Sequence, residues 1–456
     1  MTHSQHLSNF ITEVTLSDIP AEVVARAKVH LLDTLGVAFV GSAQPHAVNA
    51  VKAVAALPGS AGKCQVWGGK GQTFSAPYAA LVNGVAAHVL DYDDTHTDSI
   101  AHGSAVLAPT IFALAEELGY GGEEALCAYI TGWEVLARIG MGARGSFHKR
   151  GFHTTAVAGT FGAAAAAAKL LKLNPAQTVN ALGLAGSQAS GVVEFLSNGS
   201  SSKCFHAGWS AHSGILAAHL AQGGLTGPET IFEGRYGLYA THGTAAEADI
   251  CSVSAELGSR WEMLRVSIKP FPCCHFGHAF ISCAFMLRAD GIMADDIAEI
   301  ECIVDPIEVA LICEPLSEKF KPLTPYEAKF SLPFMVASAL VDGDVGMRTF
   351  TPTNIACPSV LDLTPKIKYR NAAPGETTFP KYFPGWIIAT LRDGRRIEKR
   401  LDVNYGNPDN PMQEEDVRKK FLANVEGIIS PAQAVELMTW IAGLEQWPSS
   451  QWHFTA

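Results

Sequence analysis

A long succession of helical segments constrains the fold of this chain more than any other feature. Apolar residues recur at helical spacing from residue 17 to about residue 260, and glycines or short polar clusters separate the segments. No strand-like runs alternate with them, as a doubly wound α/β fold would require. The sequence therefore predicts an all-helical domain over residues 1–264, with helices at 17–40, 76–91, 103–119, 122–141, 153–171, 175–195 and 206–223.

Strand-like patterns first occur after this domain. Residues 264–272 and 297–305 alternate between apolar and polar side chains, and 331–343 has helical spacing. Residues 385–403 contain two strand runs around Asp393-Gly394, which is a strong hairpin signal. We therefore expect a smaller α+β domain after the helical one.

The predicted domain plan places this α+β domain at residues 265–405. Residues 412–425 and 431–445 return to helical spacing, the second opened by Ser430-Pro431. We expect residues 406–456 to pack back on the helical domain. The predicted fold class is therefore mainly α, with an α+β second domain.

The composition narrows the possible partners. Charged residues are 17% of the 456 residues, against about 25% in an ordinary soluble domain, and 48% are hydrophobic. We therefore expect much buried surface and a homodimer. The net charge of −11, with no basic stripe to offset it, argues against nucleic-acid binding. An anionic substrate would need a local basic pocket.

The sequence predicts neither secretion nor a membrane span. The ten cysteines have no framework spacing, and residues 1–14 lack the basic and apolar regions of a signal peptide. The alanine-rich stretch at 160–173 is too short and too weakly hydrophobic to cross a bilayer. We expect a reduced, cytoplasmic protein.

The stretch "HVLDYDDTHTDSIAH", residues 88–102, gathers polar residues between two apolar runs. Asp91, Asp94 and Thr95 follow a helix pattern that ends at Leu90, where acids oppose the helix dipole by roughly 0.3–1 kcal/mol each. A solvated loop would tolerate one such acid. The whole cluster favours a functional site.

Two further stretches are candidates for anion binding. In residues 144–159, His153 and two threonines precede an alanine-rich helix, so the helix N-terminus could bind an anion or the segment could be a basic surface turn. In residues 197–214, a Gly/Ser loop runs into a helix with Lys203 and His206 at the junction. This loop could hold a carboxylate or phosphate, or it could be a flexible connector.

The stretch "KPFPCCHFGH" contains Lys269, Cys273, Cys274, His275 and His278. Metal binding is one interpretation, but vicinal cysteines rarely bind one ion together and no CxxC partner occurs elsewhere. We favour a buried thiol pair beside a functional histidine and lysine, with no metal.

These four stretches, in this order, resemble the MmgE/PrpD family, which includes 2-methylcitrate dehydratases, cis-aconitate decarboxylases and iminodisuccinate epimerases. The resemblance rests on "VNGVAAHVLDYDDTH", "GFHTTAVAGTFGAAAAAAKLL", "SSKCFHAGWSAHSGILAAHLAQGGLTGPETIFEG" and "IKPFPCCHFGHAF". "TPYEAKFSLPFMVASAL" and the hairpin extend it over nearly the whole chain. One departure is His102-Gly103-Ser104, where the family frequently has His-Pro-Ser.

The resemblance implies a large helical domain built from both chain ends, a smaller α+β lid, a homodimer, and no metal or organic cofactor. It places catalytic residues at Asp91, His102, His153 and Lys269. The expected substrate-binding residues are Thr95, Lys203, His206, His275 and His278.

The family's reactions all build negative charge on a carbon next to a carboxyl group, and this charge needs fixed positive charge and hydrogen-bond donors nearby. Lys203, Lys269 and protonated histidines would supply that field. His102 is the expected general acid–base, and Asp91 is expected to orient the histidines. The other acids of the stretch are expected to cap a helix, pair with lysines or face solvent: Asp93, Asp94 and Asp98.

The sequence thus predicts a lyase for a small tri- or dicarboxylic acid, with dehydration of a 2-methylcitrate-like hydroxy acid as the first expectation. Decarboxylation of the cis-aconitate type and epimerisation of a dicarboxylate are the alternatives. A non-catalytic carboxylate-binding protein is disfavoured, because binding needs cations but no acid–base pair.

Overall fold

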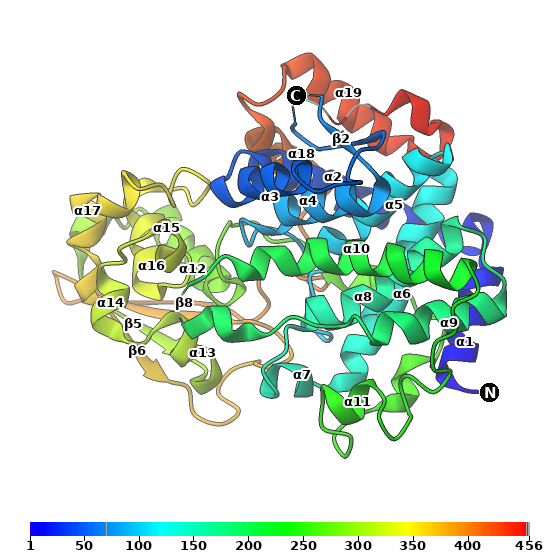
Figure 1. Ribbon diagram of the computed structural model, residues 1–456. Helices are drawn as coiled ribbons and strands as arrows, with labels where there is room; N and C mark the ends of the chain where they lie inside the picture. The colour runs from blue at the N-terminus through cyan, green and yellow to red at the C-terminus, as the bar shows by residue number, and fades with distance from the viewer. Residues whose placement is uncertain (70, 198, 453, 455–456) are drawn as a thin grey trace. The chain divides into compact units, whose positions relative to one another are not determined.

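The chain divides into two compact units in the computed structural model, which describes residues 1–69, 71–197, 199–452 and 454 (Figure 1). The helical unit consists of Met1–Ile268 and Gln413–Ala456, and the mixed unit of Lys269–Met412. The predicted fold class, mainly helical with an α+β second part, is confirmed.

The helical unit is built around α8 (Thr154–Leu170), whose side chains are almost all buried. Helix α8 contacts α5, α6, α9 and α10. The other helices of the unit are α1 (His3–Glu13), α2 (Ala21–Ser42), α3 (Pro45–Ala55), α4 (Ala76–His88), α5 (Ser104–Leu118), α6 (Gly122–Ala143), α7 (Ser146–Lys149), α9 (Pro175–Gly186), α10 (Ser202–Gln222), α11 (Leu238–Thr241), α18 (Glu414–Val425) and α19 (Pro431–Ala442).

Small residues let these helices approach closely. A Cβ on Gly84 of α4 would lie 2.6 Å from the Cα of Gly208 on α10, and one on Gly162 of α8 would lie 2.8 Å from the Cβ of Leu136 on α6. Both distances are shorter than van der Waals contact, so a larger side chain would separate the helices. The alanines and glycines of the sequence therefore set the spacing of this core.

The predicted helix at 175–195 is wrong in its second half, because α9 ends at Gly186. Gly191 has a φ of 105°, which a continuing helix cannot adopt, and its carbonyl oxygen accepts a hydrogen bond from the backbone N–H of His153 at 2.9 Å. Helix α10 begins at Ser202, earlier than the predicted residue 206. Residues 187–192 instead form an irregular segment beside His153, and the 3-10 helix Val193–Ser197 follows it.

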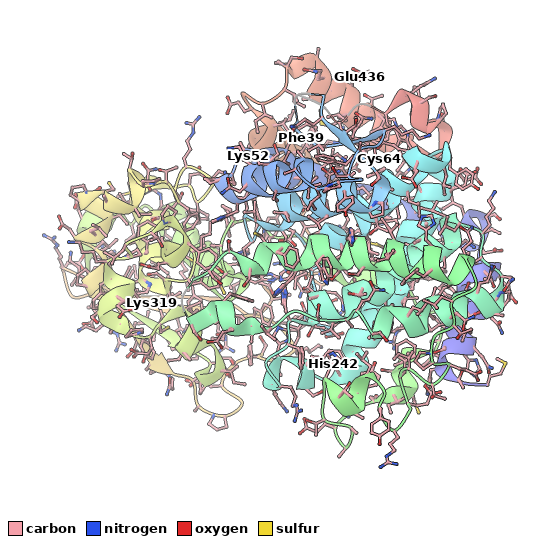
Figure 2. All side chains as sticks on the ribbon, viewed as in Figure 1. Phe39, Lys52, Cys64, His242, Lys319 and Glu436 are labelled. Atoms are coloured by element: carbon pink, nitrogen blue, oxygen red, sulfur yellow. The ribbon has the colours of Figure 1, made fainter. Side chains whose placement is uncertain are left out.

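The C-terminal helices belong to the helical unit. Both α18 and α19 contact α2, which lies near the start of the chain (Figure 1). In the same part of the unit, Phe39 and Cys64 are buried while Lys52 and Glu436 are exposed (Figure 2). The two chain ends thus share one core.

Short strand pairs also occur in the helical unit. Strand β1 (Cys64–Gln65) pairs with β2 (Thr73–Phe74), and β3 (Thr95–His96) pairs with β4 (Val266–Ser267). The strand predicted at 264–272 is therefore only two residues long. This short strand, β4, lies beside a predicted site residue, because its Ser267 is paired with Thr95.

The mixed unit contains a four-stranded sheet in the order β6-β5-β7-β8. Strands β5 and β6 are parallel, whereas β7 is antiparallel to both β5 and β8. The predicted hairpin is present, with Gly394 at a φ of 88° in its turn. The elements are β5 (Ile297–Val304), β6 (Ile367–Asn371), β7 (Gly385–Leu391), β8 (Arg396–Leu401), α12 (His278–Ala289), α13 (Pro306–Ile312), α14 (Leu316–Phe320), α15 (Pro325–Ala328), α16 (Leu332–Asp342) and α17 (Pro358–Leu361).

A helix that crosses a bilayer must be both long and apolar. No helix among the described residues is long and apolar enough for this.

Candidate active site

The acidic loop, defined as residues 91–94, follows the end of α4 and is buried. Asp91 is 5% exposed, and Asp93 and Asp94 are 0% exposed. Asp91 has a φ of 54°, in the left-handed region, which turns the chain sharply after the helix. Asp93 and Asp94 do not face solvent, because both bind imidazoles; Asp94 also accepts a hydrogen bond from the first backbone N–H of α5, as the predicted capping role requires. Asp98 is exposed.

His88, the last residue of α4, forms a buried pair with Asp93. Its Nδ1 lies 2.7 Å from Oδ2 of Asp93, and both side chains are fully buried. The His88 ring lies 5.1 Å from that of His102 and stacks on that of His153 at 5.7 Å. Its buried Nε2 has no hydrogen-bond partner among the described residues. No sequence pattern assigned either residue of this pair to the site.

The tautomer of His102 follows from its contacts. Its Nδ1 lies 2.8 Å from the backbone oxygen of Asp94. A carbonyl oxygen can only accept, so Nδ1 carries the proton. Thr95 Oγ1 lies 3.2 Å from the same nitrogen, and the backbone N–H of His102 donates to Thr155 Oγ1 at 3.0 Å. The ring is thereby held at one edge, and Nε2 is the nitrogen that can exchange a proton with a substrate.

His153 and His206 form a pair of neutral imidazoles. Their Nδ1 atoms are 3.1 Å apart, so one donates and the other accepts, and the two rings have opposite tautomers. Burial lowers the pKa of His153 well below its ordinary value and that of His206 to about 4, with the charges of His88 and Lys203 adding to the effect. At neutral pH these two histidines therefore add no positive charge to the site.

Lys203 is a cation beside this cluster, in the first turn of α10. Its Nζ lies 2.8 Å from Oδ1 of Asp91, and the two side chains are 15% and 7% exposed. The ion pair joins α10 to the acidic loop. Of the Gly/Ser loop before it, Asn198 lies outside the described residues.

The basic turn at the start of residues 144–159 is an exposed surface feature. Arg144 pairs with Asp249 at 2.8 Å, and Lys149 pairs with Glu247 at 2.9 Å. Both basic side chains are about two-thirds exposed. These contacts favour the interpretation as a surface turn over an anion site.

Asp94 is held by groups from two helices. Its Oδ2 lies 2.8 Å from His30 Nδ1 on α2, and the backbone N–H and hydroxyl of Ser104 on α5 donate to the same carboxyl group. The Ser104 hydroxyl also contacts Tyr129 of α6. Burial raises the pKa of Asp94 to about 7, although the Ser104 hydrogen bonds oppose the rise. The residue that fixes His102 through its backbone is therefore itself fixed through its side chain.

The remaining predicted residues lie in the mixed unit. Lys269 is 1% exposed. His275 Nε2 accepts from Asn404 Nδ2 at 2.9 Å, and His278 Nε2 donates to the backbone oxygen of Cys273 at 3.1 Å. The two histidine rings are 4.9 Å apart. That Lys269, His275 and His278 act in catalysis or binding stays a prediction.

Among residues 1–69, 71–197, 199–452 and 454, no group of three or more His, Cys, Asp or Glu side chains has an arrangement that could hold a metal ion.

Comparison with protein families matches the two parts of the chain in order. The MmgE/PrpD N-terminal domain matches residues 5–250, and the MmgE/PrpD C-terminal domain matches residues 271–445. The chain belongs to the MmgE/PrpD family.

Similar members of the MmgE/PrpD family align over almost the full chain. A cis-aconitate decarboxylase-like protein of Aspergillus oryzae is 28% identical, with 96% of this chain and 94% of that protein covered. The cis-aconitate decarboxylase of Mus musculus is 28% identical, with 97% and 90% covered. The enzyme of that name from Homo sapiens is 29% identical, with 93% and 88% covered.

The structure adds residues to the site that the MmgE/PrpD resemblance did not assign. His88 and Asp93 lie within residues 88–102. Their position between two apolar runs is the sequence feature that could have indicated a role in the site. His30 has no such signal, because it lies on α2 and reaches Asp94 only in the folded chain.

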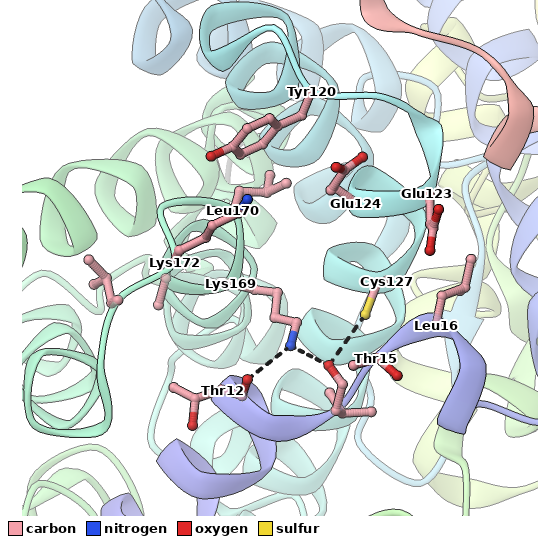
Figure 3. Close-up of a pocket in the computed structure, with 13 residues that line it drawn as sticks. Thr12, Thr15, Leu16, Tyr120, Glu123, Glu124, Cys127, Lys169, Leu170 and Lys172 are labelled. Atoms are coloured by element: carbon pink, nitrogen blue, oxygen red, sulfur yellow. Dashed lines mark hydrogen bonds between the residues drawn. The ribbon is translucent and has the colours of Figure 1, made fainter.

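A separate pocket of about 380 Å³ lies at the C-terminal end of α8 (Figure 3). Lys169 Nζ there bonds the backbone oxygens of Thr12 and Val14, and the ammonium of Lys172 lies 4.7 Å from the Tyr120 ring centroid. The predicted site residues of the helical unit gather around His153, which precedes the other end of the helix. The pocket is therefore no part of the candidate active site.

Proposed function

We propose that this protein is a lyase that removes carbon dioxide from a small unsaturated tricarboxylic acid of the cis-aconitate type. Full-length similarity to proteins named cis-aconitate decarboxylase supports this reaction within the family. The observation that carries the proposal is the fixed tautomer of His102, which assigns proton transfer to Nε2.

Decarboxylation breaks the bond between a carbon atom and its carboxylate group. The electron pair stays on that carbon and spreads toward a neighbouring carboxylate, carbon dioxide leaves, and one proton must be added to the carbanion. The enzyme therefore has to stabilise the charge and deliver the proton.

The helical unit offers groups for both tasks. His102 in its protonated form would deliver the proton from Nε2, because Nδ1–H stays bound to Asp94. Lys203 would bind a carboxylate of the substrate, exchanging part of its contact with Asp91. Of the neutral pair His153 and His206, the ring that accepts at Nδ1 would donate from Nε2 to the substrate without adding charge. Of these groups, only Lys203 is a permanent cation.

Dehydration of a 2-methylcitrate-like hydroxy acid is the second candidate, and one observation favours it. Neutral His102 with Nδ1 protonated has a lone pair on Nε2, which can remove a proton, and a second imidazole, His88, lies 5.1 Å away. Dehydration needs both a base and an acid, whereas decarboxylation needs only a proton donor. Epimerisation of a dicarboxylate shares the need for a base.

A substrate panel separates these reactions. The purified protein is incubated with cis-aconitate, 2-methylcitrate and a chiral dicarboxylate, and released carbon dioxide, new double bonds and loss of optical activity are measured. We expect carbon dioxide from cis-aconitate and, in heavy water, one carbon-bound deuterium in the product. His102→Asn serves as the matched inactive control. Dehydration without carbon dioxide release would overturn the decarboxylase assignment in favour of the second candidate.

A further inference from the structure

Lys420 is a buried lysine on α18, far along the chain from the acidic loop. Its side chain is 3% exposed. Two of its neighbours on the same helix, Arg418 and Lys419, are 46% and 67% exposed and pair with acids of α18. A buried ammonium group is costly unless several partners replace its water. The burial of Lys420 therefore depends on the groups that its ammonium contacts.

The ammonium of Lys420 makes three contacts. It lies 2.7 Å from Oδ1 of Asp33 on α2, donates to the backbone oxygen of Tyr92 at 3.1 Å, and lies 3.8 Å from the centroid of the Tyr92 ring. Two of these contacts are to the acidic loop. Tyr92 stands between Asp91, which binds Lys203, and Asp93, which binds His88.

We propose that Lys420 is a positioning residue of the active site, which holds the peptide of Tyr92 and so aims the carboxylates of Asp91 and Asp93. A shift of this peptide would move both carboxylates at once. It would also move the backbone oxygen of Asp94, which fixes the tautomer of His102. Part of the site would thus depend on a helix from the C-terminal end of the chain.

Neutralising Asp33 is the simpler explanation for Lys420. It requires only the contact with the carboxylate, and an apolar pair of similar volume is often as stable as a buried ion pair. Neutralising Asp33 does not explain why Lys420 also donates to the Tyr92 backbone oxygen and lies over the Tyr92 ring. Removal of both charges tests the two explanations against each other.

The experiment compares Lys420→Met with the double variant Asp33→Asn/Lys420→Met. The single variant leaves Asp33 buried without its ammonium, so we expect a lower Tm. The double variant removes that carboxylate charge, so we expect it to recover most of the lost Tm. If Lys420 positions the loop, kcat of the double variant stays about 10-fold to 100-fold below wild type, because misplacement of about 1 Å has effects of this size. Recovery of both Tm and kcat would overturn the proposal.

A second readout does not depend on activity. Hydrogen–deuterium exchange of peptides that cover residues 89–96 should be faster in the double variant than in wild type, while peptides of α8 should exchange alike. Unchanged exchange in the loop would overturn the positioning role. Lys419→Met, at the exposed neighbouring position, is the matched control and should equal wild type in all readouts.

The kinetic readout rests on the proposed function, whereas the exchange readout does not. Failure of wild type to convert any acid of the panel would refute the proposed function alone. The exchange of the double variant would still decide whether Lys420 holds the loop.

Discussion

The acidic loop and the sheet of the mixed unit treat their charged residues in opposite ways. In the loop, Asp93 and Asp94 are fully buried and each binds a histidine from a neighbouring element. In the sheet, Lys368 and Glu299 pair across β6 and β5 with side chains 57% and 48% exposed. Water stabilises the charges of the sheet, whereas protein groups must stabilise those of the loop.

This difference shows that the loop places charged groups where their burial costs folding free energy. A buried carboxyl group loses its hydration and needs hydrogen bonds or a cation in return. Asp94 shows the effect, because burial raises its pKa to about 7. The sheet has no comparable requirement. Substitutions in the loop should therefore affect activity and stability strongly, and substitutions on the sheet surface only slightly.

His102→Asn should have the largest effect. An asparagine can still donate to the Asp94 oxygen but cannot transfer a proton, so we expect kcat to fall by about 10²-fold to 10⁴-fold with little change in substrate binding. Steady-state kinetics with the substrate found in the panel measures both. An unchanged Tm should accompany the loss, and turnover equal to wild type would refute the role of His102.

Gly103→Ala should destabilise the protein by about 1–3 kcal/mol, because the added Cβ would lie 2.5 Å from Cη2 of Trp133. Gly394→Ala in the hairpin is the contrasting variant. Nothing lies within 4 Å of its Cβ position, and its cost comes from a φ of 88°.

Urea unfolding of both glycine variants, alone and combined with Trp133→Phe, measures the contrast. The smaller ring should restore part of the stability of Gly103→Ala and none of that of Gly394→Ala, since only the first contact involves Trp133. Equal effects of Trp133→Phe in both backgrounds would contradict the steric explanation.

Acid should destabilise the helical unit through its neutral histidines. Burial lowers the pKa of His148 and His206 to about 4, whereas histidines of the unfolded chain have a pKa of about 6.5. Between these values the unfolded chain binds protons that the folded chain does not. The free energy of unfolding should therefore fall as the pH drops from about 6.5 to about 4.

Asp94 acts in the opposite direction over the same range, because its pKa is raised, so the measured quantity is a difference between variants. The fall in unfolding free energy from pH 6.5 to 4.5 should be smaller in His206→Gln than in wild type. His6→Gln, at an exposed position of α1, is the control. An identical fall in wild type and His206→Gln would contradict the prediction.

Lys368→Met should have the smallest effect. Its pair with Glu299 is half-exposed, so the unfolding free energy should change by no more than about 0.5 kcal/mol. Urea unfolding at low and high salt measures this change. A loss as large as that of Gly103→Ala would remove the contrast between sheet and loop.

The sequence by itself determined the features that depend on near neighbours. Helical spacing predicted α5, α6 and α8 closely, because these helices are fixed by local hydrogen bonds and by apolar side chains at regular positions. Asp393-Gly394 predicted the hairpin, because the turn needs a residue that adopts a positive φ. The polar stretch at 88–102 likewise marked the candidate site, since charges between apolar runs are conspicuous in any sequence.

Only the tertiary structure decided which partner each of these charges has. Asp93 binds His88 five residues away, but Asp94 binds His30, and Lys420 reaches Tyr92 from the C-terminal part of the chain. No local pattern encodes contacts between such distant residues, because they arise only when helices pack. The low pKa of His206 has the same origin, since burial and neighbouring charges set it after the chain has folded.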